Sequence, residues 1–176
     1  MRVVVGLPAE QEKSRSGVEL EMNLQIEGSL AAILTPSFPP ELHCFNSESF
    51  HFFLDRELAE SNRYGHFSCF ALFHFESSHN GELLHKFVRA LSENIRNTDY
   101  LGMIDDSTVG LILQHASVEN TRKVMDRLVK ELKAVFPSQN GVSIRASSAV
   151  FPTEANTRAS LEGLAEERLK AAELRH

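Results

Sequence analysis

One stretch of this chain carries most of its structural information: Arg96-Asn97-Thr98-Asp99-Tyr100-Leu101-Gly102-Met103-Ile104-Asp105-Asp106-Ser107-Thr108-Val109-Gly110-Leu111-Ile112-Leu113. It opens with an arginine and an aspartate three residues apart, where a helical pattern ends. Two short apolar runs, 100–104 and 109–113, then flank an acidic turn, and this pattern predicts a β-hairpin. A helix end that presents a guanidinium and a carboxylate beside a hairpin indicates a surface able to hold a nucleotide.

The sequence on either side of this stretch predicts the rest of an α+β domain. Apolar residues at helical spacing predict four helices, running from Asn46 or Ser47 to Gly65, from Leu83 through Arg96, from a capping Ser117 through Leu132, and over 159–174. Apolar runs predict strands over 67–75 and 142–151. The inner part of this order is the ferredoxin-like βαββαβ arrangement, an antiparallel sheet with helices on one face. The first and last helices are additions to it.

The N-terminal part reads as a separate β element. Strict alternation of apolar and polar residues over 18–26, a Glu27-Gly28 turn and a second run over 29–34 predict a β-hairpin. Prolines then end regular structure, so 35–45 is predicted to be a linker. The chain therefore divides into 1–45, a hairpin and linker, and 46–176, the α+β domain.

Composition limits the classes of function. The chain has 176 residues, 42% of them hydrophobic, which suffices for one good core, and its formal net charge is −6. No basic stripe is visible, so nucleic acid is not an expected partner. Cys44 and Cys69 form no CxxC pair and are predicted to be reduced thiols, which fits a cytoplasmic protein. No apolar run is long enough to span a bilayer, so any membrane association would come from another component of a complex.

With these residues in this order, the chain resembles the GGDEF domains, the catalytic fold of bacterial diguanylate cyclases, over roughly residues 46–176. Residues 54–65 are similar to the family's opening helix, and Arg96-Asn97-Thr98-Asp99 matches its RxxD inhibitory-site motif. Residues 144–152 are similar to a family strand that ends in small residues and a proline, and 163–172 resemble its final helix. The joint order and spacing carry the resemblance.

The family's signature pentapeptide falls on residues 105–109, Asp-Asp-Ser-Thr-Val, and all five positions depart from it. Acidic residues replace the two glycines that let the backbone approach nucleotide phosphates. Ser107 and Thr108 replace the acidic pair, and His74 occupies the slot of a metal-binding aspartate. The segment between Glu76 and Leu83 lacks the family's substrate loop. Because divalent cations need hard oxygen ligands in fixed places, the resemblance implies a domain without cyclase activity, metal or cofactor.

The motif that remains is RxxD, which in the family binds cyclic di-GMP away from the active site. An arginine pairs bidentately with phosphate or with a guanine edge, each contact worth about 1–3 kcal/mol, and an aspartate accepts from guanine N–H groups. The family often adds an arginine from the following helix; Arg127 falls at that position, with Lys123 one turn earlier on the same face. The resemblance thus implies a ligand site of Arg96, Asp99, Arg127 and Lys123.

A structural interpretation stands beside this one. An arginine and an aspartate three apart can be a solvated pair worth only ~0.2–0.5 kcal/mol. The domain would then be a ligand-free module for protein interaction or dimerisation. The histidines 74, 79 and 85 lack the spacing of a metal site, and an acidic hairpin turn is favoured for backbone reasons alone.

The N-terminal hairpin adds a second resemblance, since residues 24–34 are similar to the closing strands of GAF domains. A GAF remnant before a degenerate GGDEF domain that keeps RxxD resembles the PelD-type cyclic di-GMP receptors of exopolysaccharide secretion. This resemblance implies a receptor that signals to a protein partner in polysaccharide export or motility, at a membrane-associated complex. A homodimer is a further expectation.

Overall fold

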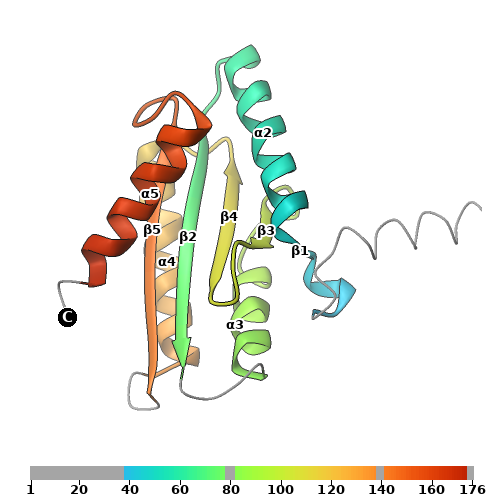
Figure 1. Ribbon diagram of the computed structural model, residues 1–176, viewed down its shortest axis with the longest axis vertical. Helices are drawn as coiled ribbons and strands as arrows, with labels where there is room; N and C mark the ends of the chain where they lie inside the picture. Colours follow the sequence, from blue (N-terminus) through green and yellow to red (C-terminus); the bar gives the residue numbers. More distant parts are fainter. Residues whose placement is uncertain (1–37, 78–81, 138–140, 174–176) are drawn as a thin grey trace, which may run out of the picture. The chain divides into compact units, whose positions relative to one another are not determined.

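The computed structural model describes residues 38–77, 82–137 and 141–173, which form an α+β fold (Figure 1). Its elements, in chain order, are η1 (Pro40–Leu42), β1 (Cys44–Phe45), α2 (Ser47–Tyr64), β2 (Ser68–Ser77), α3 (Glu82–Ser92), β3 (Tyr100–Met103), β4 (Thr108–Gln114), α4 (Val118–Val135), β5 (Val142–Phe151) and α5 (Arg158–Glu173). The hairpin predicted for 18–34 lies outside the described residues.

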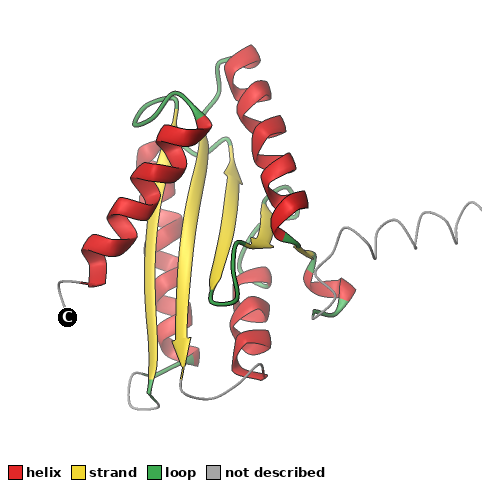
Figure 2. Ribbon diagram, in the orientation of Figure 1, coloured by secondary structure: helices red, strands yellow, loops and turns green. Residues whose placement is uncertain are grey.

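The strands form one five-stranded sheet in the order β1-β3-β4-β2-β5 (Figure 2). β2 is antiparallel to both of its neighbours, so that Phe70 lies opposite Ile112 on one side and Ala149 on the other. β3 and β4 pair as the predicted hairpin. The order β3-β4-β2-β5 is that of a ferredoxin-like sheet, and the predicted βαββαβ core is confirmed.

Two helices cover each face of the sheet (Figure 1). On one face α3 and α4 bury the apolar side chains Phe87, Leu91, Leu128 and Leu132. On the other, α2 and α5 bury Phe50, Leu54, Leu161 and Ala165. The first and last helices, predicted as additions, therefore give the sheet its second covered face. None of the described helices is both long and apolar enough to cross a bilayer.

The helix caps follow local sequence signals. Asn46 Oδ1 accepts a hydrogen bond from Ser49 N at 2.8 Å, and Ser117 caps α4 in the same way. Gly65 ends α2 with φ 69°, a left-handed conformation that suits glycine. These predicted boundaries are confirmed.

The linker predicted for 35–45 was wrong over the part that the structure describes. Cys44 and Phe45 form β1, an edge strand that runs parallel to β3 and pairs with Leu101 and Gly102. Leu42 and Cys44 are buried in the core. A strand of two residues is too short to show alternation, so the sequence pattern carries no sign of it. Cys44 and Cys69 are both free and buried.

The predicted end of the second helix was also wrong. α3 ends at Ser92, four residues before Arg96. Asn94 turns its side chain back and donates from Nδ2 to Ala90 O at 2.9 Å, which satisfies a carbonyl of the last helical turn. Ile95 packs against the core from outside the helix, and this contact reproduces the apolar spacing of a longer helix.

A close approach between α2 and the hairpin sets the spacing of this face. Gly102 and Gly110 lie opposite each other on β3 and β4, and the fully buried ring of Phe50 covers both. A Cβ added at Gly110 would lie 2.6 Å from Phe50 Cζ and 2.8 Å from Ile104 Cδ1. The two glycines are therefore required for space, because any side chain there would push the helix away.

We expect Gly110→Ala to lower the free energy of unfolding by about 1–3 kcal/mol, since the methyl group must displace Phe50. The matched control is Gly163→Ala in α5, where an added Cβ meets nothing within 4 Å. That change should raise stability by about 0.5–1 kcal/mol, because alanine is the better helix former. Urea unfolding of both variants measures the two effects; equal stabilities would contradict the packing described here.

Candidate functional site

The RxxD motif lies in a tight turn that follows α3, not on the helix itself. Asp99 N donates to Arg96 O at 3.0 Å, which closes the turn. In return, Arg96 N donates to Asp99 Oδ2 at 3.0 Å. The Arg96 side chain is left exposed. The predicted helix end was thus a turn built around the aspartate, and the guanidinium is presented to solvent from it.

The other oxygen of Asp99 holds the end of the neighbouring strand. Gln114 N, on the last residue of β4, donates to Asp99 Oδ1 at 3.2 Å. Burial raises the pKa of Asp99 above its ordinary value, although the two backbone N–H donors and the charges of Arg96 and Arg127 act to lower it. Asp99 is therefore a half-buried carboxyl group whose two oxygens each accept a backbone hydrogen bond.

Arg127 and Lys123 both lie exposed on α4. The charge of Arg127 is the weakest of the influences that act to lower the pKa of Asp99. Lys123 Nζ lies 2.7 Å from Glu119 Oε1, one turn back along the same helix. Of the four predicted site residues, Arg96 and Asp99 are joined by hydrogen bonds within the turn.

This turn has the chemistry for an anionic ligand that also carries N–H donors. The exposed guanidinium of Arg96 supplies forked donors for phosphate or a guanine edge. Each oxygen of Asp99 accepts one backbone N–H and keeps a second lone pair for a ligand donor. A carboxylate held at both oxygens is preorganised, so a ligand would not have to order it.

The side chains of the acidic turn at 105–107 form hydrogen bonds within the turn. Asp105 Oδ1 accepts hydrogen bonds from Ser107 N at 2.8 Å and from Ser107 Oγ at 3.1 Å. Burial acts to raise the pKa of Asp105, but hydrogen bonds from Ser107 and Thr108 outweigh it and hold the pKa below its ordinary value. These contacts favour a structural role for the acidic turn, in which Asp105 stabilises the backbone.

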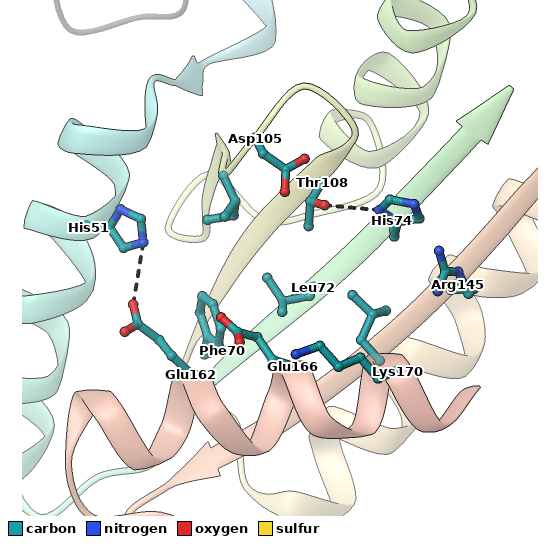
Figure 3. Close-up of a pocket in the computed structure, with 12 residues that line it drawn as sticks. His51, Phe70, Leu72, His74, Asp105, Thr108, Arg145, Glu162, Glu166 and Lys170 are labelled. Atoms are coloured by element: carbon teal, nitrogen blue, oxygen red, sulfur yellow. Dashed lines mark hydrogen bonds and ion pairs between the residues drawn. The ribbon is translucent and has the colours of Figure 1, made fainter. Parts of the chain in front are cut away.

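His74 and Thr108 meet where the resemblance implies metal ligands. The two residues face each other across β2 and β4, and His74 Nδ1 lies 3.1 Å from Thr108 Oγ1 (Figure 3). The pair therefore consists of an imidazole and a neutral hydroxyl, with no carboxylate in it. Among the described residues, no group of three His, Cys, Asp or Glu side chains is placed to hold a metal ion.

A cavity of ≈ 360 Å³ lies beside this pair, between the sheet, α2 and α5 (Figure 3). Its floor is apolar, formed by Phe70, Leu72, Ile104 and Leu169, and its rim mixes acids with bases. The rim residue Glu162 is already engaged, 3.5 Å from His51 Nε2 and 3.0 Å from Arg158 Nε. Asp105 adds a carboxylate to the rim, which disfavours a polyphosphate there.

Two residues near Asp99, Glu57 and Gln114, are not predicted from the sequence as part of the site. Glu57 is buried on α2, and its Oε2 accepts from Gln114 Nε2 at 2.7 Å. A signal was present, because Glu57 follows Leu54 by three residues and so falls on the apolar stripe of the helix. For Gln114, at the end of a strand, the sequence has no comparable sign.

Comparison with known proteins gives a family and a set of related folds. Residues 78–176 match the family model described as diguanylate cyclase, GGDEF domain. No curated protein matches the chain.

Solved structures match over most of the chain. The coiled coil and GGDEF domain of DgcB from Caulobacter crescentus, in complex with c-di-GMP, gives a TM-score of 0.74 at 14% identity, covering 94% of this chain and 93% of that chain. Diguanylate cyclase SiaD from Pseudomonas aeruginosa, in complex with its activator SiaC, gives 0.72 at 17% identity, covering 94% and 67%. The FimX GGDEF domain from the same organism gives 0.67 at 14% identity, covering 80% and 95%. At such low identity the likeness shows the fold alone.

We expect the pKa of Asp99 to lie above its ordinary value of 3.8 and to rise further in Arg127→Ala, which removes a nearby positive charge. The matched control is Lys123→Ala, which should leave this pKa unchanged because Lys123 pairs with Glu119. A carboxyl-carbon NMR titration measures all three. An identical Asp99 titration in wild type and Arg127→Ala would place Arg127 out of range.

The raised pKa of Asp99 also determines how its contribution to stability changes with pH. For an acid whose pKa is raised by folding, the contribution to stability is greatest below the ordinary pKa and is lost as pH rises through the raised value. As the pH rises from the ordinary pKa of Asp99 through its raised value, the free energy of unfolding of wild type should therefore fall relative to that of Asp99→Asn. Urea unfolding at a series of pH values measures this difference.

Proposed function

The chain belongs to the GGDEF domain family, and we propose that it is a non-catalytic member that binds cyclic di-GMP at the Arg96–Asp99 turn. The observation that carries the proposal is the hydrogen-bonded Arg96–Asp99 turn, which fixes both oxygens of the Asp99 carboxylate and leaves the Arg96 side chain exposed. Lys123 is included as a fourth ligand residue, which would have to leave its exposed pair with Glu119 to reach the ligand.

The chemistry of the turn matches that of the ligand. Cyclic di-GMP presents phosphates and guanine edges, and exposed guanidinium groups bind both bidentately. Guanine also presents N–H donors, which a carboxylate with free lone pairs accepts. The related DgcB structure contains c-di-GMP, which supports this class of ligand for the fold.

We propose that catalysis is absent because of the residues that stand at the positions of the family's active site. Ser107, Thr108 and His74 stand at the positions that the resemblance implies for metal ligands. A hydroxyl and an imidazole are poor ligands for Mg²⁺, which prefers carboxylate oxygens. Asp105, at the rim of the cavity, and the adjacent Asp106 stand where the resemblance implies glycines, and their charges would repel the phosphates of a nucleotide.

We further propose that ligand binding signals to a protein partner, in the cytoplasm and at a membrane-associated complex such as exopolysaccharide export machinery. The resemblance to PelD-type receptors supports the process, and the SiaD structure with its activator supports a protein partner for a fold of this kind. A homodimer remains part of this proposal. No nucleic acid or cofactor is included in it.

One observation favours the alternative, a ligand-free interaction module. Both oxygens of Asp99 already accept backbone hydrogen bonds, so the aspartate has a structural role whether or not a ligand binds. Under this alternative the motif persists because it shapes the turn. Ligand titration separates the two, because only a receptor gives heat with cyclic di-GMP.

Calorimetric titration of wild type with cyclic di-GMP should give saturable binding. Loss of one bidentate contact in Arg96→Ala or Arg127→Ala should weaken it by about 5- to 150-fold, the equivalent of about 1–3 kcal/mol. The matched control is Arg122→Ala on α4, five residues before Arg127 and so on a different side of the helix. Absence of heat with wild type at micromolar ligand would leave the interaction module as the better account.

The proposed lack of catalysis has its own test. Wild type incubated with GTP and either Mg²⁺ or Mn²⁺ should form no cyclic di-GMP, because the carboxylates that would hold the metal are missing. Chromatography of the nucleotides measures the product, with an active diguanylate cyclase as the positive control. Any product that disappears in Thr108→Val would show that the altered site still works.

A further inference from the structure

A buried polar cluster connects helix α2 to the candidate ligand turn. We call it the Glu57 network; it consists of Glu57, Ser61, Ser68 and Gln114. Glu57 is 3% exposed, and its Oε1 accepts from Ser68 Oγ, which lies 2.6 Å from Ser61 Oγ. His66 Nε2 lies 3.5 Å from the same oxygen and is buried, without a hydrogen-bond partner among the described residues.

Gln114 joins this network to Asp99. Its side-chain Nε2 donates to Glu57 Oε2 at 2.7 Å, while its backbone N donates to Asp99 Oδ1 at 3.2 Å. One residue therefore contacts two carboxylates, one buried on α2 and one at the ligand turn. Asp99 in turn accepts from Arg96 N, so the connection reaches the arginine that is proposed to bind ligand.

The connection is stiff for a physical reason. A buried carboxylate is costly unless its oxygens are hydrogen-bonded, so Glu57 holds its partners in place. Hydrogen bonds in such a poorly solvated cluster also reinforce one another. A shift of α2 relative to β4 would break the contact between Glu57 and Gln114, and the last residue of β4 would no longer be held from both sides.

We propose that Glu57 and Gln114 are positioning residues through which α2 sets the geometry of Asp99, and thereby the ligand affinity of the turn. The first half of this proposal, the coupling of α2 to Asp99, concerns the unliganded protein. The second half rests on the proposed function. Because coupling between two sites is reciprocal, ligand at the turn would also hold α2 more firmly on the sheet.

The test of the coupling is amide hydrogen exchange followed by NMR. Gln114→Met keeps the length of the side chain and removes its donor. It should speed exchange at the Arg96 and Gln114 amides by about tenfold or more, since these amides report the local opening of Asp99. Glu57→Gln keeps the shape of the side chain and one of its two acceptor oxygens, and it should give a smaller change at the same amides. The Phe70 and Ala149 amides, from the β2–β5 pair, are the internal reference.

The matched control is Leu58→Val, a buried change on the same helix outside the network. It should alter exchange only in proportion to its effect on global stability. The proposal is supported when Gln114→Met and Glu57→Gln speed hydrogen exchange at the Arg96 and Gln114 amides more than at the reference amides. It is overturned when their effect is spread evenly over all amides, as in the control, or when exchange is unchanged.

A ligand arm separates this inference from the function on which it partly rests. If wild type binds cyclic di-GMP, Gln114→Met should weaken binding by about fivefold or more. Unchanged affinity despite selective loosening would overturn the second half of the proposal. If wild type does not bind, the proposed function fails, and the exchange result by itself decides whether α2 and Asp99 are coupled.

Discussion

The contact between Phe50 and the facing glycines Gly102 and Gly110 determines how closely α2 approaches the β3–β4 hairpin. Other features of this face follow from it. His51, the next residue, reaches the rim of the cavity, and Glu57, two turns along the helix, lies over the end of β4. The two regions of functional interest therefore share one packing contact, although they lie at opposite ends of the hairpin.

Much of the fold could be predicted because its signals are local. The caps at Asn46 and Ser117 and the strand over 142–151 depend on neighbouring residues and appear in the sequence as they do in the structure. β1 could not be predicted, because two residues carry no periodicity and the pairing is made with a distant strand. The end of α3 was misplaced because Ile95 continues the apolar spacing while Asn94 ends the helix.

Only part of the geometry of the candidate site follows from the sequence. Spacing and resemblance indicated Arg96, Asp99 and Arg127, and hydrogen bonds join Arg96 and Asp99 in one turn. Lys123 and Glu119 lie four residues apart on one helix, a spacing that favours the ion pair they form. The hydrogen bonds of Asp99 to backbone N–H groups could not be inferred from the sequence at all, because they depend on where β4 ends.

β1 also gives the fold a mechanical property. Its two residues connect η1 to α2 and run parallel to β3. A pull on the chain at Pro40–Leu42 is therefore transferred as shear to β3, whose first residue, Tyr100, directly follows Asp99. Tension applied at η1 would therefore reach Asp99 through β3 without passing through α2.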